Sequence, residues 1–482
     1  MRWSVAAAAP GSEVEILALT AGAIAAASGG EVVRGEASTP VGRLSIDSRT
    51  LAPGDLFVAI RGERFDGHQF AASALDRGAL GVVVDAAGAG AIEGGRPDAV
   101  VVRVADTTRA LQLVARDVRR RSGARVVAIT GSAGKTTTKE ITAEFLAARH
   151  RVFRNKGTLN NHIGLPLSLL ELRARPDVAV VELGMNHPGE IRTLVEIAEP
   201  EFRLWTNVGD AHLGFFASAD AIADAKAEIL AHASGDSVLV ANAADARVMA
   251  RVGTFKGRVV TFGMNTTADV GAFDVELRGL EGTRARVRTK QGEMDLTTPL
   301  LGLGNLSNVL AATATALEFG ISLASIRERA ATLTPAAHRG ELLRLPGGIT
   351  LIDDSYNSSP SALNRALELV GSAQGCARKV AVLGEMLELG AHAGRLHTEC
   401  GRAAADAGVD ILIAVGGTAA RALADAAVAA GMTAANVLHV ATKQEAADAV
   451  AARVRPGDHV LVKGSRGIGT DFVVERLKAE FA

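Results

Sequence analysis

The chain has few cysteines, few aromatic residues and almost no net charge. Its 482 residues include two cysteines, Cys376 and Cys400, which are too few for a disulfide framework or a cysteine-based zinc site. The net charge of −1 provides no overall basic field to attract nucleic acid or an anionic membrane. A local cluster of cations must therefore hold any anionic ligand. The scarcity of cysteine predicts a reducing compartment.

Long apolar runs are also missing. The longest candidate extends from Ile16 to Ser28, but Glu13 and Glu15 stand where a signal peptide carries positive charge. We therefore expect a helix that ends at Gly29. No stretch reaches the roughly 18 uninterrupted apolar residues that a membrane-spanning helix needs. These features predict a cytoplasmic protein with no nucleic-acid partner and no membrane insertion. We also expect a monomer that acts on small molecules.

Most of the chain alternates short Val, Ile and Leu runs with alanine-rich helical stretches. This alternation is typical of βαβ units and parallel sheets. We predict an α/β protein of three domains, because a domain averages about 150 residues. Residues 1–105 form a mixed α/β N-terminal domain, 106–334 a central P-loop ATPase-like parallel-sheet domain, and 335–482 a Rossmann-like C-terminal domain.

Several elements can be placed within these domains. The pattern predicts a helix over Thr107–Ser122, a strand over Arg125–Thr130 and a β-rich stretch near Val275–Leu296, whereas the composition of Ala86–Pro97 predicts a loop. Ligands of a doubly wound sheet bind outside the carboxyl ends of its strands. Five apolar runs predict the strands of such a sheet in the last domain: 349–354, 379–384, 411–417, 437–442 and 459–463.

The strongest local motif follows the strand predicted over 125–130. A glycine-containing loop leads into Lys135 and Thr136 and then into a helix of about fifteen residues. The backbone N–H groups of such a loop and the positive end of the helix dipole cradle phosphates. Lys135 would reach the β- and γ-phosphates, and the Thr136 hydroxyl would ligate Mg²⁺. Ile129 replaces the first glycine of the usual spacing, so the loop is a shortened variant. The predicted phosphate-binding residues are Gly131, Ser132, Ala133, Gly134, Lys135, Thr136 and Thr137.

Two more strand ends carry polar side chains. Glu182 closes the apolar run 178–182, and His212 follows the next run together with Asn207. A carboxylate at a strand tip beside a phosphate loop is well placed to hold a metal ion. Taken alone, Glu182 fits a surface carboxylate as well as a metal ligand. His212, taken alone, fits an ordinary loop histidine better than a metal ligand.

Together with those of the C-terminal domain, the motifs cover nearly the whole chain. Before the C-terminal domain they are, in order, Asp47-Ser48-Arg49, Asp66-Gly67-His68, the phosphate loop, Gly157 to Leu167, Glu182-x-Gly184, Thr206-Asn207, Ala211-His212 and Ala225-Lys226. This series resembles the Mur ligases, the ATP-dependent amide-bond-forming enzymes of peptidoglycan precursor synthesis. The resemblance implies ATP and two Mg²⁺ sites, with Lys135, Glu182, His212 and Lys226 as catalytic residues. It implies that Thr136, Glu182, His212 and a carbamylated Lys226 hold the metals.

The C-terminal motifs separate the branches of this family. Asp353-Asp354-Ser355-Tyr356-Asn357, Leu383 to Gly390 and Val462 to Arg466 resemble the D-alanyl-D-alanine-adding branch. That resemblance implies addition of D-alanyl-D-alanine to UDP-N-acetylmuramoyl-tripeptide through an acyl phosphate. It implies nucleotide contacts from Asn308, Arg339 and Asp354. The implied substrate contacts are Ser48 and Arg49 for the uridine nucleotide, Thr158, Asn160 and Asn161 for the muramyl peptide, and Tyr356, Asn357, Lys463, Ser465 and Arg466 for the dipeptide.

Two departures from the family pattern keep alternatives open. Gly304 stands where the family usually has histidine, and the segment 467–471 differs from the usual hydrophobic pattern with a glutamate. One alternative is a catalytically silent nucleotide-binding regulator. The other is a different amino-acid-adding member of the same superfamily.

Overall fold

The computed structural model describes residues 16–62, 65–92, 96–157, 159–210 and 213–481. The chain divides into two compact units. The first unit comprises residues 1–128, 149–203 and 231–237, and the second comprises 129–148, 204–230 and 238–482. Within the described residues, no helix combines the length and apolar character needed to cross a membrane.

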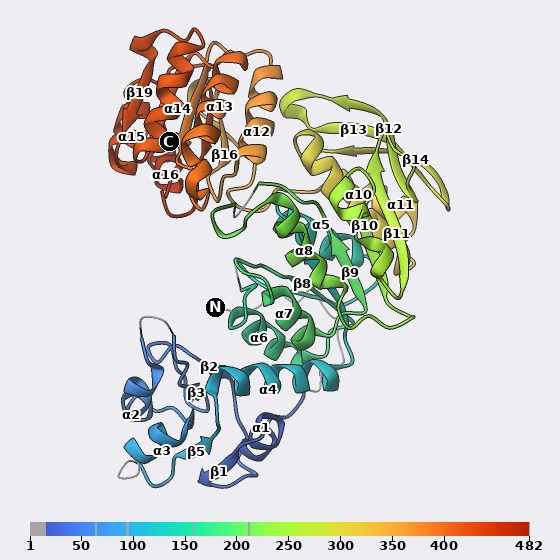
Figure 1. Ribbon diagram of the computed structural model, residues 1–482, viewed down its shortest axis with the longest axis vertical. Helices are drawn as coiled ribbons and strands as arrows, with labels where there is room; N and C mark the ends of the chain where they lie inside the picture. Colours follow the sequence, from blue (N-terminus) through green and yellow to red (C-terminus); the bar gives the residue numbers. More distant parts are fainter. Residues whose placement is uncertain (1–15, 63–64, 93–95, 158, 211–212, 482) are drawn as a thin grey trace. The chain divides into compact units, whose positions relative to one another are not determined.

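The first unit begins with a five-stranded sheet in the order β1-β5-β4-β3-β2 (blue in Figure 1). Only β1 runs antiparallel to its neighbour, and the other neighbouring strands are parallel. The strands are β1 (Glu31–Arg34), β2 (Leu44–Ser45), β3 (Leu56–Val58), β4 (Gly81–Val84) and β5 (Val100–Arg103). The mixed α/β character expected of the N-terminal region is therefore confirmed.

Three helices of this unit test the sequence-based expectations. Helix α4 (Thr107–Ser122) agrees with the prediction; the Asp106 side chain caps its first turn and left-handed Gly123 ends it. Helix α1 (Ala21–Ser28) ends at Gly29 as expected. The prediction of a loop over 86–97 was wrong, because the first part of this segment forms helix α3 (Ala86–Ala91). The Asp85 carboxylate accepts a hydrogen bond from the Gly88 N–H and so caps the first turn of the helix. The alanines of this segment favour the helix because alanine has the highest helix propensity.

The first unit also contains β7 (Val152–Arg154) and β8 (Val178–Glu182), which pair in parallel. Helix α6 (Gly164–Leu169) lies between them in sequence, and helix α7 (Glu190–Ala198) follows β8. Every residue of β8 is buried, as expected for a strand covered on both faces.

The second unit contains the phosphate-loop helix and a largely antiparallel extension. Strand β6 (Arg125–Thr130), as predicted, begins in the first unit and ends in the second, where helix α5 (Lys135–Leu146), twelve residues long, follows it. The β-rich stretch predicted near 275–296 forms part of an antiparallel meander, β12-β13-β14. The strands that follow are β9 (Phe202–Trp205), which begins in the first unit, β10 (Val238–Asn242), β11 (Arg258–Met264), β12 (Val270–Leu277), β13 (Thr283–Thr289) and β14 (Gly292–Thr298). The helices are α8 (Ala219–Ala227), α9 (Ala246–Met249), α10 (Gly302–Glu318) and α11 (Leu323–Ala330).

The C-terminal part of the second unit is a six-stranded sheet in the order β15-β16-β20-β17-β18-β19 (orange to red in Figure 1). The five predicted strands are confirmed, although β18 and β19 each end two residues earlier than expected. Strand β15 was not predicted; it pairs antiparallel with β16 at the edge. The strands are β15 (Glu341–Leu345), β16 (Ile349–Asp354), β17 (Lys379–Gly384), β18 (Ile411–Val415), β19 (Val437–Val440) and β20 (His459–Lys463).

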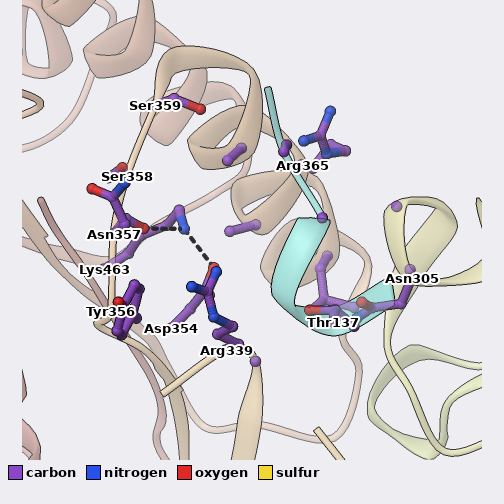
Figure 2. Close-up of a pocket in the computed structure, with 18 of the residues that line it drawn as sticks. Thr137, Asn305, Arg339, Asp354, Tyr356, Asn357, Ser358, Ser359, Arg365 and Lys463 are labelled. Carbon is purple, nitrogen blue, oxygen red and sulfur yellow. Dashed lines mark hydrogen bonds and ion pairs between the residues drawn. The ribbon is translucent and has the colours of Figure 1, made fainter. Parts of the chain in front are cut away.

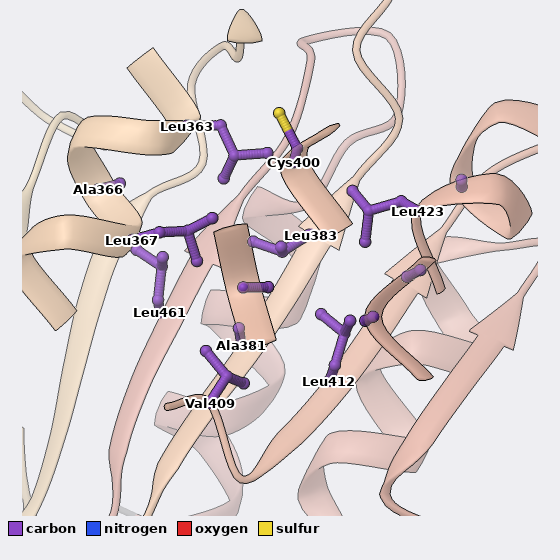
Figure 3. Packing of buried hydrophobic residues seen from close by; sticks show 14 of the residues in the cluster. Leu363, Ala366, Leu367, Ala381, Leu383, Cys400, Val409, Leu412, Leu423 and Leu461 are labelled. Carbon is purple, nitrogen blue, oxygen red and sulfur yellow. The ribbon is translucent and has the colours of Figure 1, made fainter. Parts of the chain in front are cut away.

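Helices cover both faces of this C-terminal sheet. On one face, Leu363 and Leu367 of α12 (Pro360–Ser372) pack with Leu383 and Leu461 of the strands (Figure 3). Helices α13 (Ala393–Asp406) and α14 (Thr418–Ala429) complete this layer. Helices α15 (Lys443–Ala451) and α16 (Asp471–Glu480) contribute to a second apolar cluster on the other face. This three-layer arrangement leaves the carboxyl ends of the strands for ligands.

Candidate functional site

The phosphate loop is held by residues that follow β9. The Ala133 N–H donates to the Asn207 Oδ1 at 2.9 Å, and the Asn207 amide donates back to the Ala133 carbonyl at 3.1 Å. The Thr206 hydroxyl donates to the same carbonyl at 2.7 Å. These bonds fix the loop conformation, and the Lys135 ammonium lies over the loop, 2.9 Å from the Gly131 carbonyl.

Glycine is required at two positions of this loop by close approach and by backbone conformation. A Cβ on Gly131 would lie 1.9 Å from the Thr206 hydroxyl, and one on Gly134 would lie 2.3 Å from the Asn308 Oδ1. Gly134, at the start of α5, has a φ of +82°, in the region that favours glycine. The loop therefore packs directly against the two polar side chains that flank it.

Asn308 connects the loop to helix α10. Its Oδ1 accepts a hydrogen bond of 3.2 Å from the Thr138 hydroxyl in α5, and its amide donates to the Asn305 Oδ1 at 3.3 Å. Asn308 is 8% exposed, so the structure places this predicted nucleotide residue against the base of the loop.

A cavity of about 680 Å³ lies within the second unit. The phosphate loop and the first turn of α10 line it on one side, and segments near the carboxyl ends of β16 and β20 line it on the other (Figure 2). The structure thus brings into one cavity, as lining residues, Ser132, Ala133, Gly134, Lys135, Thr137, Asn308, Arg339, Asp354, Tyr356, Asn357, Lys463, Ser465 and Arg466. A cavity of this size is in the range that holds a nucleotide-sized ligand.

The two adjacent aspartates at the end of β16 have different environments. Asp353 is buried, and its carboxylate accepts hydrogen bonds from the Ser355 hydroxyl at 2.6 Å and from the His338 ring at 2.7 Å. Its carbonyl accepts the Gly340 N–H. Asp353 therefore anchors the segment that carries Arg339, whereas Asp354 lines the cavity.

Lys463 ties the second aspartate to the segment that follows it. The Lys463 side chain is 3% exposed, and its ammonium contacts the Asp354 carboxylate at 2.6 Å and the Asn357 carbonyl at 3.0 Å (Figure 2). A buried ammonium needs such partners, because desolvation of an unpaired charge is costly.

Tyr356 lies between two arginines. The Arg339 guanidinium is 4.1 Å and the Arg466 guanidinium 5.0 Å from the centre of its ring. Cations at these distances are attracted by the quadrupole of the ring. The only tyrosine of the chain thus links two cations from different loops of the C-terminal sheet.

Ser465 has a positioning role in the structure. It is 4% exposed, and its hydroxyl accepts the Leu387 N–H at 2.9 Å. Leu387 and its neighbours also line the cavity. Ser465 therefore fixes the loop after β17 against the loop after β20.

In the first unit, Glu182 ends β8 and is 4% exposed. The Asn160 amide donates to its carboxylate at 2.8 Å, while the Asn155 Oδ1 accepts the Glu182 N–H. The Asn161 Oδ1 accepts the N–H groups of Ile163 and Gly164 at the start of α6. Asn160 thus orients the carboxylate, and Asn161 organises the following helix.

The predicted uridine-nucleotide residues also lie in the first unit. Arg49 is exposed, and its guanidinium pairs with Asp47 at 2.9 Å; Ser48 between them is partly exposed. The hydrogen bonds from Arg49 lower the pKa of Asp47 to about 2. The segment therefore presents an arginine whose orientation is set by its neighbour.

Lys226 is the remaining described candidate for the metal centre. It lies in α8 and is 1% exposed, an unusual environment for a lysine. Among the described residues, no group of three or more His, Cys, Asp or Glu side chains is placed to hold a metal ion. His212 and Thr158 lie outside the described residues.

The sequence reasoning missed several residues that shape the cavity. Asp353, which anchors the Arg339 segment, was not assigned a role, and Asn305 and Arg365 also line the cavity. Asn305 had a sequence signal, since it stands three residues before Asn308 on one helix face. Arg365 is an arginine within an amphipathic helix, a pattern that does not differ from that of an ordinary surface residue.

The fold and site together define a nucleotide-binding enzyme with a phosphate loop and a Rossmann-like C-terminal sheet. Family models match three successive regions of the chain. The model for the Mur ligase family catalytic domain matches residues 40–119, the Mur ligase middle domain matches 129–316, and the Mur ligase glutamate ligase domain matches 338–466. The chain belongs to the Mur ligase family.

Individual relatives agree with this assignment. The UDP-N-acetylmuramoyl-tripeptide–D-alanyl-D-alanine ligase of Bacillus subtilis is 33% identical over 93% of this chain and 96% of its own length. A crystal structure of MurF from Acinetobacter baumannii is similar with a TM-score of 0.86 and 30% identity, covering 97% of this chain and all of its own. MurF from Thermotoga maritima in complex with ADP has a TM-score of 0.79 and 28% identity, covering 91% and 97% of the two chains.

Proposed function

We propose that this protein is an ATP-dependent ligase that adds D-alanyl-D-alanine to UDP-N-acetylmuramoyl-tripeptide. The observation that carries this proposal is that the phosphate loop and the Tyr356 segment line the same cavity. One cavity then accommodates the activated phosphate chain and the incoming dipeptide. The high coverage of relatives that carry this activity in their names supports the same reaction.

The nucleotide occupies the part of the cavity beside the phosphate loop. Residues 131–137 bind its phosphates through the Lys135 ammonium and through those N–H groups that do not donate to Asn207, as the N–H groups of Ser132 and Ala133 do. Arg339 reaches the phosphates from the C-terminal sheet. Asn308 contacts the adenine, and Asp354 contacts the ribose. Lys463 holds Asp354 in place through their ion pair of 2.6 Å.

The dipeptide occupies the part of the cavity beside Tyr356 and Asn357. Arg466 is the cation that receives its carboxylate, while Ser465 holds the neighbouring loop. Lys463 forms the floor of this part, between Asp354 and the Asn357 carbonyl. A planar guanidinium suits a carboxylate because it can donate two parallel hydrogen bonds.

The reaction couples the cleavage of ATP to the formation of an amide. An oxygen of the terminal carboxylate of the tripeptide attacks the γ-phosphorus of ATP. The bond between the γ-phosphorus and the oxygen that bridges it to the β-phosphate breaks, and ADP leaves. The dipeptide amine then attacks the carbonyl carbon of the acyl phosphate, and the amine nitrogen loses a proton. The tetrahedral intermediate expels phosphate, which keeps one oxygen of the original carboxylate. Lys135 and Arg339 stabilise the charge that develops on the phosphoryl group.

The residues assigned to Mg²⁺ have suitable chemistry for it. The Thr136 hydroxyl, the Glu182 carboxylate and a carbamate on Lys226 would supply oxygen ligands, with His212 as a nitrogen ligand. Lys226 is 1% exposed, and a carbamate there would carry a negative charge that a bound Mg²⁺ would compensate. A bound Mg²⁺ would neutralise phosphate charge. Asn160 orients Glu182 toward this task.

The uridine nucleotide and muramyl peptide are assigned to Ser48, Arg49, Thr158, Asn160 and Asn161. This substrate assignment rests on the family motifs and on the exposure of Arg49. We further propose domains at 1–105, 106–334 and 335–482, and a monomer that acts in the cytoplasm.

The test is phosphate release from ATP and Mg²⁺ with UDP-muramyl tripeptide and D-alanyl-D-alanine. We expect release only when both substrates are present, with the mass of the pentapeptide nucleotide as product. Release with a free amino acid on the dipeptide nucleotide would assign another activity within the family. ADP binding without turnover of any substrate pair would favour the regulator.

A further inference from the structure

The cations that line the cavity differ in what they contact. Within the described residues, Lys463 is paired with Asp354, Lys135 lies over the Gly131 carbonyl, and Arg339 and Arg466 stack on Tyr356. Arg365 also lines the cavity, yet in the described part of the chain it makes no hydrogen bond or ion pair. A guanidinium has five donors, so a ligand that fills the cavity meets unused donors there.

Arg365 lies beside the first turn of α10. A Cβ built on Gly304 would come within 3.3 Å of the Arg365 Nε and 3.5 Å of its Cδ. The arginine therefore occupies the space into which a side chain at position 304 would project. Glycine at 304 and arginine at 365 fit together, and a larger residue at 304 would displace the guanidinium.

The first turn of α10 adds a second set of donors at this point. Helix α10 is 17 residues long, and its N-cap residue Leu301 provides no side-chain cap for the first N–H groups. Gly302, Gly304 and Asn305 of this turn line the same cavity. Unsatisfied N–H groups and the positive end of a helix dipole favour an anion.

The charges around Arg365 leave it available for an anion. Glu368 and Asp354 act on it electrostatically, but Asp354 is bound to Lys463, and neither carboxylate is within ion-pair distance of Arg365. The side chain is exposed to the cavity, while the surrounding atoms partly desolvate it and lower its pKa. Desolvation strengthens the interaction of a guanidinium with an anionic partner.

We propose that Arg365 binds the phosphate chain of the nucleotide, in the space that Gly304 leaves open beside the first turn of α10. This inference rests on the proposed ATP site and adds a residue to it. Arg365 belongs to α12 of the C-terminal sheet, whereas the phosphate loop precedes α5. The arginine therefore makes nucleotide affinity depend on the C-terminal part of the chain.

Direct binding of ADP to the full-length protein tests the proposal without any need for turnover. Arg365→Ala should weaken ADP binding about tenfold, as expected for the loss of a charge-assisted hydrogen bond, and Arg365→Lys should weaken it less. Arg402→Ala removes an exposed arginine of α13 outside the cavity and should leave the affinity unchanged. Affinity for GDP should fall in parallel with that for ADP, because the phosphate chain is the shared group.

A double-mutant cycle tests the relation to position 304. Gly304→Val should weaken ADP binding in the wild-type background, and the loss in the double variant Gly304→Val/Arg365→Ala should be smaller than the product of the two single losses. Unchanged ADP affinity in Arg365→Ala would overturn the inference while leaving the proposed function intact. A changed preference between ADP and GDP, without a parallel loss, would assign Arg365 to the base instead and overturn it too. No ADP binding by the wild-type protein would overturn both.

Discussion

The stacking of Arg339 and Arg466 on Tyr356 yields a quantitative prediction. Replacement of Tyr356 by alanine removes both contacts, at 4.1 and 5.0 Å from the ring centre. Each cation–π contact at a partly exposed site is worth about 0.5 to 1 kcal/mol, so the two together contribute about 1 to 2 kcal/mol. If this energy orients the two arginines for catalysis, kcat/KM for the dipeptide falls by roughly 5- to 30-fold.

The ring is the critical part of this residue, so Tyr356→Phe should keep kcat/KM within about twofold of wild type. The assay is steady-state phosphate release at saturating ATP and tripeptide nucleotide. Phe472→Ala is a matched control, because Phe472 lies 5.5 Å from the Lys443 ammonium and does not line the cavity. The reasoning is refuted if Tyr356→Phe is as damaging as Tyr356→Ala, since the hydroxyl would then be the important group.

Three further predictions concern other parts of the molecule. Gly134→Ala should abolish measurable ADP binding, because its Cβ would lie 2.3 Å from the Asn308 Oδ1, whereas Gly29→Ala meets nothing within 4 Å and should bind ADP normally; equal binding by both contradicts the loop geometry. Asn160→Ala should raise the Mg²⁺ concentration for half-maximal activity by about tenfold or more, since a residue that orients a metal ligand is lost; an unchanged Mg²⁺ dependence would separate Glu182 from the metal. Burial raises the pKa of the Cys400 thiol to about 12, so Cys376 alone should react with a thiol reagent at pH 8 in the native protein, and both thiols after unfolding. The unfolded thiol ionises near 9, so this group should lower the stability of the fold as the pH rises from about 9 toward 12, which thermal unfolding across that range would reveal.

The sequence was most informative where a repeated pattern or a backbone constraint sets the structure. The five apolar runs of the C-terminal sheet begin where predicted, because strands buried on both faces need continuous apolar residues. Strand β15 was missed because its alternation is weak and it lies at the edge, with partly exposed residues. Helix α3 was missed because glycine and alanine together are compatible with a loop, and its Asp85 cap is a single residue.

The candidate site was predictable only in part for a similar reason. Gly131, Gly134 and Lys135 stand in a local pattern, so their placement could be expected. Asp353 and Asp354 have different roles because they contact different residues that are distant in sequence, such as His338 and Lys463 respectively. Arg365 and Gly304 are 61 residues apart in sequence but close in space. A local sequence pattern cannot predict such a long-range contact.

The central claim is that the tripeptide carboxylate is activated by phosphoryl transfer before the dipeptide amine attacks it. The most direct measurement uses UDP-muramyl tripeptide labelled with ¹⁸O in its terminal carboxylate, together with ATP, Mg²⁺ and D-alanyl-D-alanine, and mass analysis of both products. We predict that the released phosphate carries one labelled oxygen and that the pentapeptide nucleotide has lost one. Pentapeptide nucleotide formed together with unlabelled phosphate would contradict the account, because the carboxylate oxygen would then have left by a route other than transfer to the γ-phosphoryl group.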